Sequence, residues 1–131
     1  MTLQFSTTLI NTRLDAIETT LGTAAILHIA TGSVPANCAA ADSGTTLIDM
    51  SLPSDYLSAA SGGVKSKNGT WSGTATGTGT PGHFRMKDSG AAAVHVQGSA
   101  GVGSGDLNLN GNFTSGQTVT ISAFAITGAG A

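Results

Sequence analysis

The feature that most constrains the fold is a series of short segments, from residue 25 onward, in which apolar and polar residues alternate. Alternation at a period of two places apolar side chains on one face of a β-strand. The clearest examples are residues 46–52, 83–87 and 106–110, and glycine-rich stretches separate them. Seven or eight such strands joined by short turns are typical of a β-sandwich or a jelly-roll-like barrel. We therefore expect an all-β domain.

The remaining strands are predicted at residues 25–30, 70–76, 93–97 and 117–127. Asp88-Ser89-Gly90 is a strong turn signal and predicts a hairpin between 83–87 and 93–97. In that hairpin Phe84 and Met86 face inward, whereas Arg85 and Lys87 face outward. Residues 98–105 are expected to form a flexible glycine loop, and 128–131 a small mobile tail. The expected core anchors are Trp71, Phe84, Met86, Val119 and Ile121.

One amphipathic helix precedes the strands. Ile10, Leu14, Ile17 and Leu21 recur at helical spacing, with Gly22 as the C-cap and Ser6 or Thr7 as the N-cap. The sequence thus divides into an arm and helix, 1–22, and a β domain, 23–131, which together form one compact unit. The apolar helix face either contacts another subunit, the preferred interpretation, or covers the chain's own sheet.

Composition excludes several classes of function. Only 9% of the 131 residues are charged, and the five Lys and Arg residues are scattered, so we expect no nucleic-acid binding. No apolar run is long enough to span a membrane, and the first residues lack the pattern of a signal peptide. The single cysteine, Cys38, is expected to be a small buried hydrophobe. We expect a protein made in a bacterial cytoplasm that stays soluble or joins a particle.

No motif indicates catalysis or a cofactor. A symmetric hairpin would bring His83 and His95 opposite each other, where a third ligand could complete a zinc site, but two partly exposed strand histidines are the favoured interpretation. His28 is expected inside the domain with its hydrogen bonds satisfied. The G-x-G-x-x-G match at 77–82 precedes a predicted strand rather than a helix, which argues against a nucleotide site. Asp88 and Asp106 are expected to cap turns.

Several segments resemble small virion proteins of tailed bacteriophages. They are residues 12–18, 71–75, 82–88, 97–98, 106–109 and 116–120. The resemblance covers most of the chain and implies a head-decoration, or cement, protein on the outer surface of the capsid. Such a protein binds across joints between copies of the major capsid protein and acts as a homo-oligomer, a trimer or a dimer.

The resemblance leaves the position within the virion open. Tail and fibre proteins have a similar glycine-rich β composition, so the alternative is a tail or fibre protein that recognises a host glycan. Sugars stack on exposed aromatic rings, and most of the six Trp, Tyr and Phe residues are expected to face inward. A small β-barrel enzyme that uses the histidines is the third hypothesis. In the preferred interpretation the chain is not an enzyme.

Overall fold

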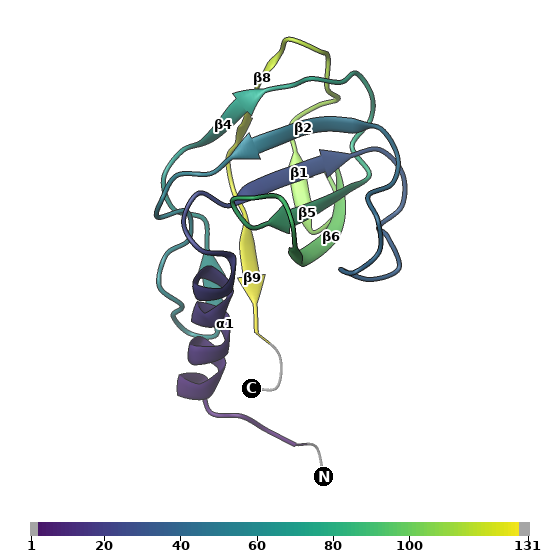
Figure 1. Ribbon diagram of the computed structural model, residues 1–131. Coiled ribbons are helices and arrows are strands. Elements are labelled where there is room, and N and C mark those ends of the chain that lie inside the picture. Colours follow the sequence, from purple (N-terminus) through teal and green to yellow (C-terminus); the bar gives the residue numbers. More distant parts are fainter. Residues whose placement is uncertain (1–2, 129–131) are drawn as a thin grey trace.

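The computed structural model describes residues 3–128 and shows a β-rich body with one helix at its N-terminal end (Figure 1). The all-β class with a single N-terminal helix is therefore confirmed. The described residues form nine strands, more than the seven or eight predicted. The elements are α1 (Thr7–Leu21), β1 (Ile26–Ala30), β2 (Thr46–Ser51), β3 (Val64–Ser66), β4 (Trp71–Thr74), β5 (His83–Lys87), β6 (Val94–Val102), β7 (Leu107–Leu109), β8 (Thr118–Ile121) and β9 (Ala125–Thr127).

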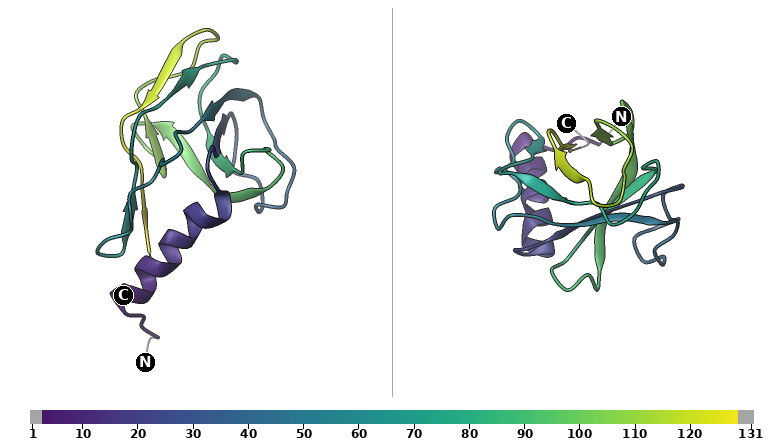
Figure 2. Two further views of the ribbon diagram at one scale, coloured as in Figure 1. Left: turned by 60° about the vertical axis from the view of Figure 1, so that its left-hand side comes forward. Right: turned by 90° about the horizontal axis from the view of Figure 1, so that it is seen from above.

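The main sheet has the strand order β2-β1-β5-β6-β7. Its neighbouring strands are antiparallel, except that β6 and β7 are parallel. Two antiparallel ribbons, β4-β8 and β3-β9, complete the body. The amides of Thr76 and Gly77, just beyond β4, donate to the carbonyl of Leu47 in β2, so the β4-β8 ribbon continues the curl of the main sheet (Figure 2).

Helix α1 has the ends that its sequence predicts. The Ser6 hydroxyl accepts a hydrogen bond from the amide of Leu9, and Gly22 ends the helix at φ 76°. The apolar helix face lies against the chain's own strands: Ile10, Leu14 and Leu21 are buried and Ile17 is partly buried. Ile10, Leu14 and Leu21 are therefore covered within the chain and are not available for the expected intersubunit contact, whereas for the partly buried Ile17 that contact stays a prediction.

The core lies inside the curl. All five expected anchors are buried, with Trp71 stacked at a tilt on Phe124 and Phe84 meeting Phe124 edge to face. The Trp71 indole N–H donates to the carbonyls of Tyr56 and Asn68, so its polar atom is satisfied. Burial of apolar side chains, these rings among them, is the main favourable contribution to the stability of such a domain.

The hairpin between β5 and β6 is wider than predicted. A symmetric turn about Ser89 would pair His83 with His95, but His83 pairs with Ser99, and a register shift lies between Met86 and Lys87. The Asp88 carboxylate accepts from the amides of Ala92 and Ala93, and this lengthens the turn. The two histidines are therefore not opposite each other, which removes the geometric basis of the zinc hypothesis.

The predicted glycine loop at 98–105 is also corrected. Strand β6 runs through Gly98 to Val102, and only the four residues 103–106 connect it to β7. Parallel neighbours usually need a much longer crossover. Here Gly103 and Gly105 adopt positive φ, and the Asp106 carboxylate accepts from the amide and hydroxyl of Ser99, which holds the tight reversal.

The single strand predicted at residues 117–127 is divided into two strands, β8 and β9. Residues 122–124 interrupt it between β8 and β9, so that Phe124 is buried while Ala123 and Ala125 are exposed. Strand β9 pairs with β3, a strand that the sequence did not predict. Most of the expected mobile tail, residues 129–131, lies outside the described residues.

Candidate interaction site

A row of polar side chains crosses four strands of the main sheet. Asp49 of β2 pairs in register with His28 of β1, His28 pairs with Arg85 of β5, and Arg85 pairs with Gln97 of β6. Register partners share one face of a sheet, so the row lies on the face opposite the core. His28 Nδ1 is 2.6 Å from Asp49 Oδ1, and Arg85 Nε donates to Gln97 Oε1 at 3.1 Å.

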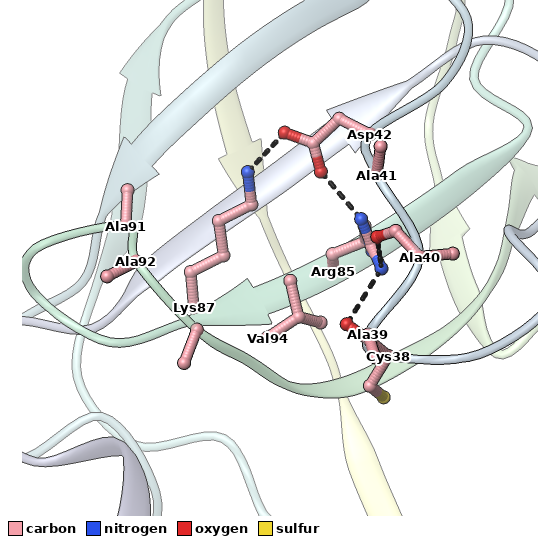
Figure 3. A pocket seen from close by; sticks show the side chains of 11 residues that line it. Cys38, Ala39, Ala40, Ala41, Asp42, Arg85, Lys87, Ala91, Ala92 and Val94 are labelled. Carbon is pink, nitrogen blue, oxygen red and sulfur yellow. Dashed lines mark hydrogen bonds and ion pairs between the residues drawn. The ribbon is translucent and has the colours of Figure 1, made fainter.

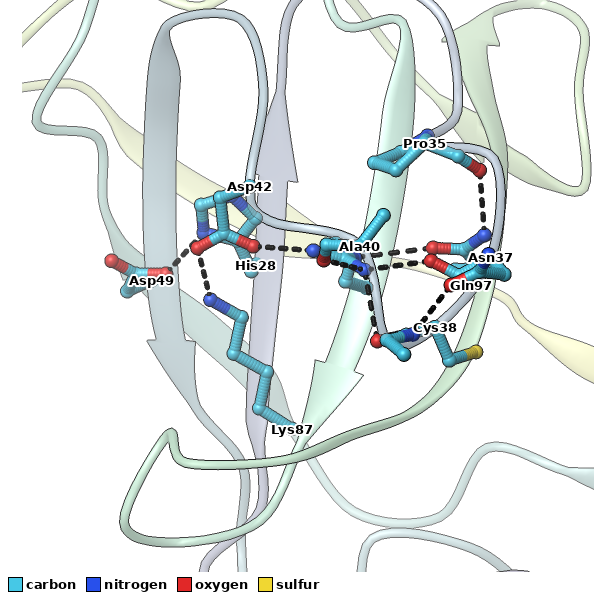
Figure 4. Close-up of polar contacts among 11 residues, drawn as sticks. His28, Pro35, Asn37, Cys38, Ala40, Asp42, Asp49, Lys87 and Gln97 are labelled. Carbon is cyan, nitrogen blue, oxygen red and sulfur yellow. Dashed lines mark hydrogen bonds and ion pairs between the residues drawn. The ribbon is translucent and has the colours of Figure 1, made fainter.

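Residues 33–42, which we call the strap, cover the part of this row around Arg85 (Figure 4), whereas the Asp49 side chain is 56% exposed. The Arg85 guanidinium donates to three strap carbonyls at 2.9–3.2 Å and to the Asp42 carboxylate at 2.7 Å. The Gln97 amide donates to the carbonyl of Pro35 at 2.8 Å. The strap carbonyls that accept from Arg85 belong to Asn37, Cys38 and Ala40. One arginine thus supplies the hydrogen-bond donors for three backbone carbonyls of a loop that contains no β-strand.

Arg85 and Lys87 face outward from the sheet as predicted, but neither side chain is exposed. Both side chains leave β5 on the outer face, as the alternation requires, but the strap leaves Arg85 only 1% exposed and Lys87 7%. A buried charge is tolerated when it is paired and hydrogen-bonded. Asp42 supplies the pairing for both cations, with Lys87 Nζ at 2.6 Å and Arg85 Nη1 at 2.7 Å.

The Asp42 carboxylate is held in its charged form. The hydrogen bond from Lys87 is the main cause that lowers the pKa of Asp42, to about 2; partial burial opposes it, and the hydrogen bond from Arg85 adds to the lowering. The Asp42 side chain itself remains 44% exposed at the mouth of the site. Asp42 is therefore ionised, and pairs with both cations, at any pH well above its pKa of about 2.

A pocket of about 590 Å³ opens between the strap and the β5-β6 turn (Figure 3). Asp42, Arg85 and Lys87 supply its charged groups, and the other walls are formed by Cys38, Ala39, Ala40, Ala41, Ala91, Ala92, Ala93 and Val94. Ala91, on the turn side, has φ 54°, a conformation that residues with a Cβ rarely adopt. The floor is thus cationic and the walls are small and apolar. Cys38 is only partly buried at this wall, so the expectation of a buried hydrophobe is corrected.

The three histidines occupy different environments. His28 is interior as expected, but only its Nδ1 has a partner; its Nε2 is buried without one among the described residues. His83, expected to be partly exposed, is fully buried because the neighbouring loop covers it, and its Nδ1 contacts the carbonyl of Gly32. His95 is exposed. Within residues 3–128 no group of three His, Cys, Asp or Glu side chains is placed to hold a metal ion.

A second charge cluster fastens the helix. Lys65 of β3 is buried and lies 2.8 Å from both Asp15 and Glu18 of α1. Burial alone would lower the pKa of Lys65, but the hydrogen bonds to Asp15 and Glu18 outweigh it and raise the pKa. Asp15 also accepts from the amide of Ala60. This cluster holds the helix against its own β domain.

Two further sequence features have structural roles. The glycine motif at 77–82 connects β4 to β5, so strand β5 follows it where a dinucleotide site needs a helix N-terminus. Asp88 and Asp106 cap turns as predicted.

Sequence reasoning missed Asp42 and the strap as a site. Because this loop lacks periodicity, its contact with β5 follows only from the tertiary fold. The sequence contained one indication of the site. Arg85 and Lys87 lie in a strand between other predicted strands, where their charges would need partners.

Comparisons with family models, curated proteins and solved structures give no match for this chain. No helix within residues 3–128 is long and apolar enough to cross a membrane.

Proposed function

We propose that the chain is a structural virion protein of a tailed bacteriophage that decorates the capsid by binding across joints between major capsid proteins. The observation that carries the proposal is that the chain uses its charges internally. Lys65, Arg85 and Lys87, three of its five cations, are buried in ion pairs with carboxylates. The Arg13 guanidinium lies 4.9 Å from the centre of the Phe5 ring.

Internal pairing leaves a surface composed mainly of small neutral residues. Charged groups must shed water when a partner covers them, and that desolvation opposes binding unless each group finds a partner. The buried centres of protein interfaces are accordingly depleted of charged residues. A neutral surface on a rigid β body therefore suits a protein whose working state is packed against others, and many weak copies on one particle add up through multivalency.

Exposed apolar side chains are the candidate contacts. Among the described residues, the large exposed hydrophobic side chains are Leu3 (74% exposed), Leu9 (45%) and Val102. Leu3 precedes α1 and Leu9 lies in its first turn, at the end of the helix that points away from the β body (Figure 1). These two residues replace the helix face as the apolar surface offered to the capsid.

The tail or fibre alternative has weaker support. Glycan recognition relies on exposed aromatic rings, and here Tyr56, Trp71, Phe84, Phe113 and Phe124 are all buried. Phe5 is half-buried beside Arg13. A binding surface for sugars would therefore have to be built from small polar residues.

The test is binding to empty, expanded capsids of the phage that encodes the chain. Purified protein should co-sediment with them at micromolar concentration, saturably and at a fixed ratio to the capsid protein. A Leu9→Gln variant should bind less well with unchanged thermal stability, whereas Thr12→Gln, a substitution at an exposed helix position, should bind normally. No co-sedimentation would overturn the proposal, and cryo-EM density on the tail would favour the alternative.

A further inference from the structure

The pocket between the strap and the β5-β6 turn has unused binding capacity at its floor. An ammonium group has three N–H donors. Within the described residues, Lys87 Nζ uses one of them, toward Asp42 Oδ2 at 2.6 Å. Lys87 is 7% exposed and lines the pocket, so its remaining donors have little access to solvent except through that opening.

The charge of the floor is unbalanced. Among the residues that line the pocket, Arg85 and Lys87 carry two positive charges and Asp42 one negative charge, a balance of +1; the Asp88 carboxylate, which bonds to the amides of Ala92 and Ala93, is not among them. In contrast, the pocket beside Lys65 contains Asp15, Glu18 and Asp55 and is locally negative. Arg85 is already occupied by its bonds to the strap and Gln97, so Lys87 is the group available to a ligand.

The walls restrict what can enter. Six alanines and Val94 surround the cations and leave room for a methylene stem without offering further donors from their side chains. Ala91 holds its positive φ at this wall, and such strained residues concentrate at functional sites. A phosphate, with a charge of about −1.5 to −2, would exceed the local +1, and Asp42 would repel it more strongly than it repels a singly charged carboxylate. A single carboxylate, with a charge of −1, balances the local charge of +1.

We infer that this pocket binds a carboxylate presented by a protein partner, an Asp or Glu side chain, with Lys87 Nζ as the donor. The alanine walls take the methylene stem, and the carboxylate shares the ammonium with Asp42. The inference stands on the geometry of the pocket and does not require that the partner be a capsid protein.

The experiment uses acetate and a capped glutamate peptide as probes, with a capped glutamine peptide as the neutral control. At constant ionic strength, two-dimensional NMR of the labelled protein should show saturable shifts at millimolar probe for the amides of residues 39–42 and 91–94. Inorganic phosphate should produce weaker shifts. Lys87→Met should abolish the shifts, whereas Lys67→Met, which alters a cation outside the pocket, should retain them.

A second pair of variants keeps the test independent of the stability of Lys87→Met. Ala92→Glu places a tethered carboxylate at the pocket wall and should block acetate, whereas Ala92→Gln should not. Absence of saturable shifts in the wild type, equal shifts for glutamate and glutamine peptides, or equal acetate binding by the Glu and Gln variants would overturn the inference. If the protein binds capsids but not acetate, the inference about the pocket is wrong and the proposed function is retained.

Discussion

At the scale of single residues, the Asp42 carboxylate has two structural roles. It neutralises two buried cations and fastens a ten-residue strap, although its own side chain is half exposed. Removing one partner of a buried ion pair costs more than the pair contributes, because the remaining charge stays buried without compensation. Removal of the Asp42 carboxylate should therefore be strongly destabilising, because Arg85 and Lys87 would stay buried without a counter-ion.

We predict that Asp42→Asn lowers the free energy of unfolding by about 2–3 kcal/mol, below the ~3–5 kcal/mol of fully buried pairs because Asp42 is partly solvated. Urea denaturation followed by Trp71 fluorescence measures the change. Asp55→Asn is the control, since Asp55 is exposed and bonds to Asn68, and it should change the stability by less than about 0.5 kcal/mol. Equal effects of the two substitutions would contradict this account of Asp42.

The same carboxylate predicts how stability depends on pH. The folded pKa of Asp42, about 2, lies below its ordinary value of 3.8, so its contribution is complete above pH 3.8 and is lost as the pH falls toward 2. The stability difference between the wild type and Asp42→Asn should therefore shrink over this interval. Comparing the two proteins removes the contribution of Asp15, whose pKa is also lowered. A constant difference down to pH 2 would show that Asp42 does not act through its charge.

At the scale of elements, local patterns predicted most of the structure and tertiary contacts decided the rest. Helical spacing with a glycine after Leu21 predicted α1, and alternation predicted β2 and β5. The β5-β6 register was missed because Asp88 lengthens the turn with its side chain, which no periodicity reveals. The inward and outward faces of β5 were correct, but the sequence did not show that a distant loop covers the outer one.

The extension of β6 through its glycines has a packing reason. A Cβ on Gly98 would lie 2.8 Å from both Phe84 Cε1 and Asp106 Oδ2, so the strand can cross the Phe84 ring only with glycine at this position. A glycine-rich segment therefore looks like a flexible loop in the sequence, yet the absence of a side chain is what allows it to pack as a strand.

We predict that Gly98→Ala lowers the free energy of unfolding by about 1–3 kcal/mol, the cost typical of overpacking a well-filled core. Gly111→Ala is the matched control, because a Cβ there meets nothing within 4 Å, and it should change stability little. Thermal unfolding of the two variants makes the comparison. If Gly98→Ala were as stable as the control, the close contact between β6 and Phe84 would be refuted.

At the scale of the whole molecule, the arm with its helix and the β domain were expected to form one compact unit. The contacts that join them are substantial: Ile10 and Leu14 are buried, Lys65 pairs with two helix carboxylates, and the Tyr56 hydroxyl donates to the carbonyl of Gly22. An isolated helix of 15 residues is marginal in water. Its stability must therefore come from docking on the β domain.

We accordingly predict a single cooperative unfolding transition. In scanning calorimetry the measured enthalpy should equal the van't Hoff enthalpy, as for one two-state unit. Lys65→Met should lower the transition temperature without splitting the transition, because the helix cannot persist alone. Two resolved transitions, or a measured enthalpy well above the van't Hoff value, would instead indicate that the helix and the β domain unfold separately.

The complete burial of β5 has a consequence for the motions of the molecule. Every residue of this strand is buried, with the core on one face and the strap and neighbouring loops on the other, and β1 and β6 flank it on both edges. Its amide hydrogens should exchange with solvent only when the whole chain unfolds. Strand β9, short and paired only with β3, should exchange through local opening. The slowest-exchanging strand, β5, would then lie at the base of the pocket. A partner bound in the pocket would contact the strand of this protein that opens least often.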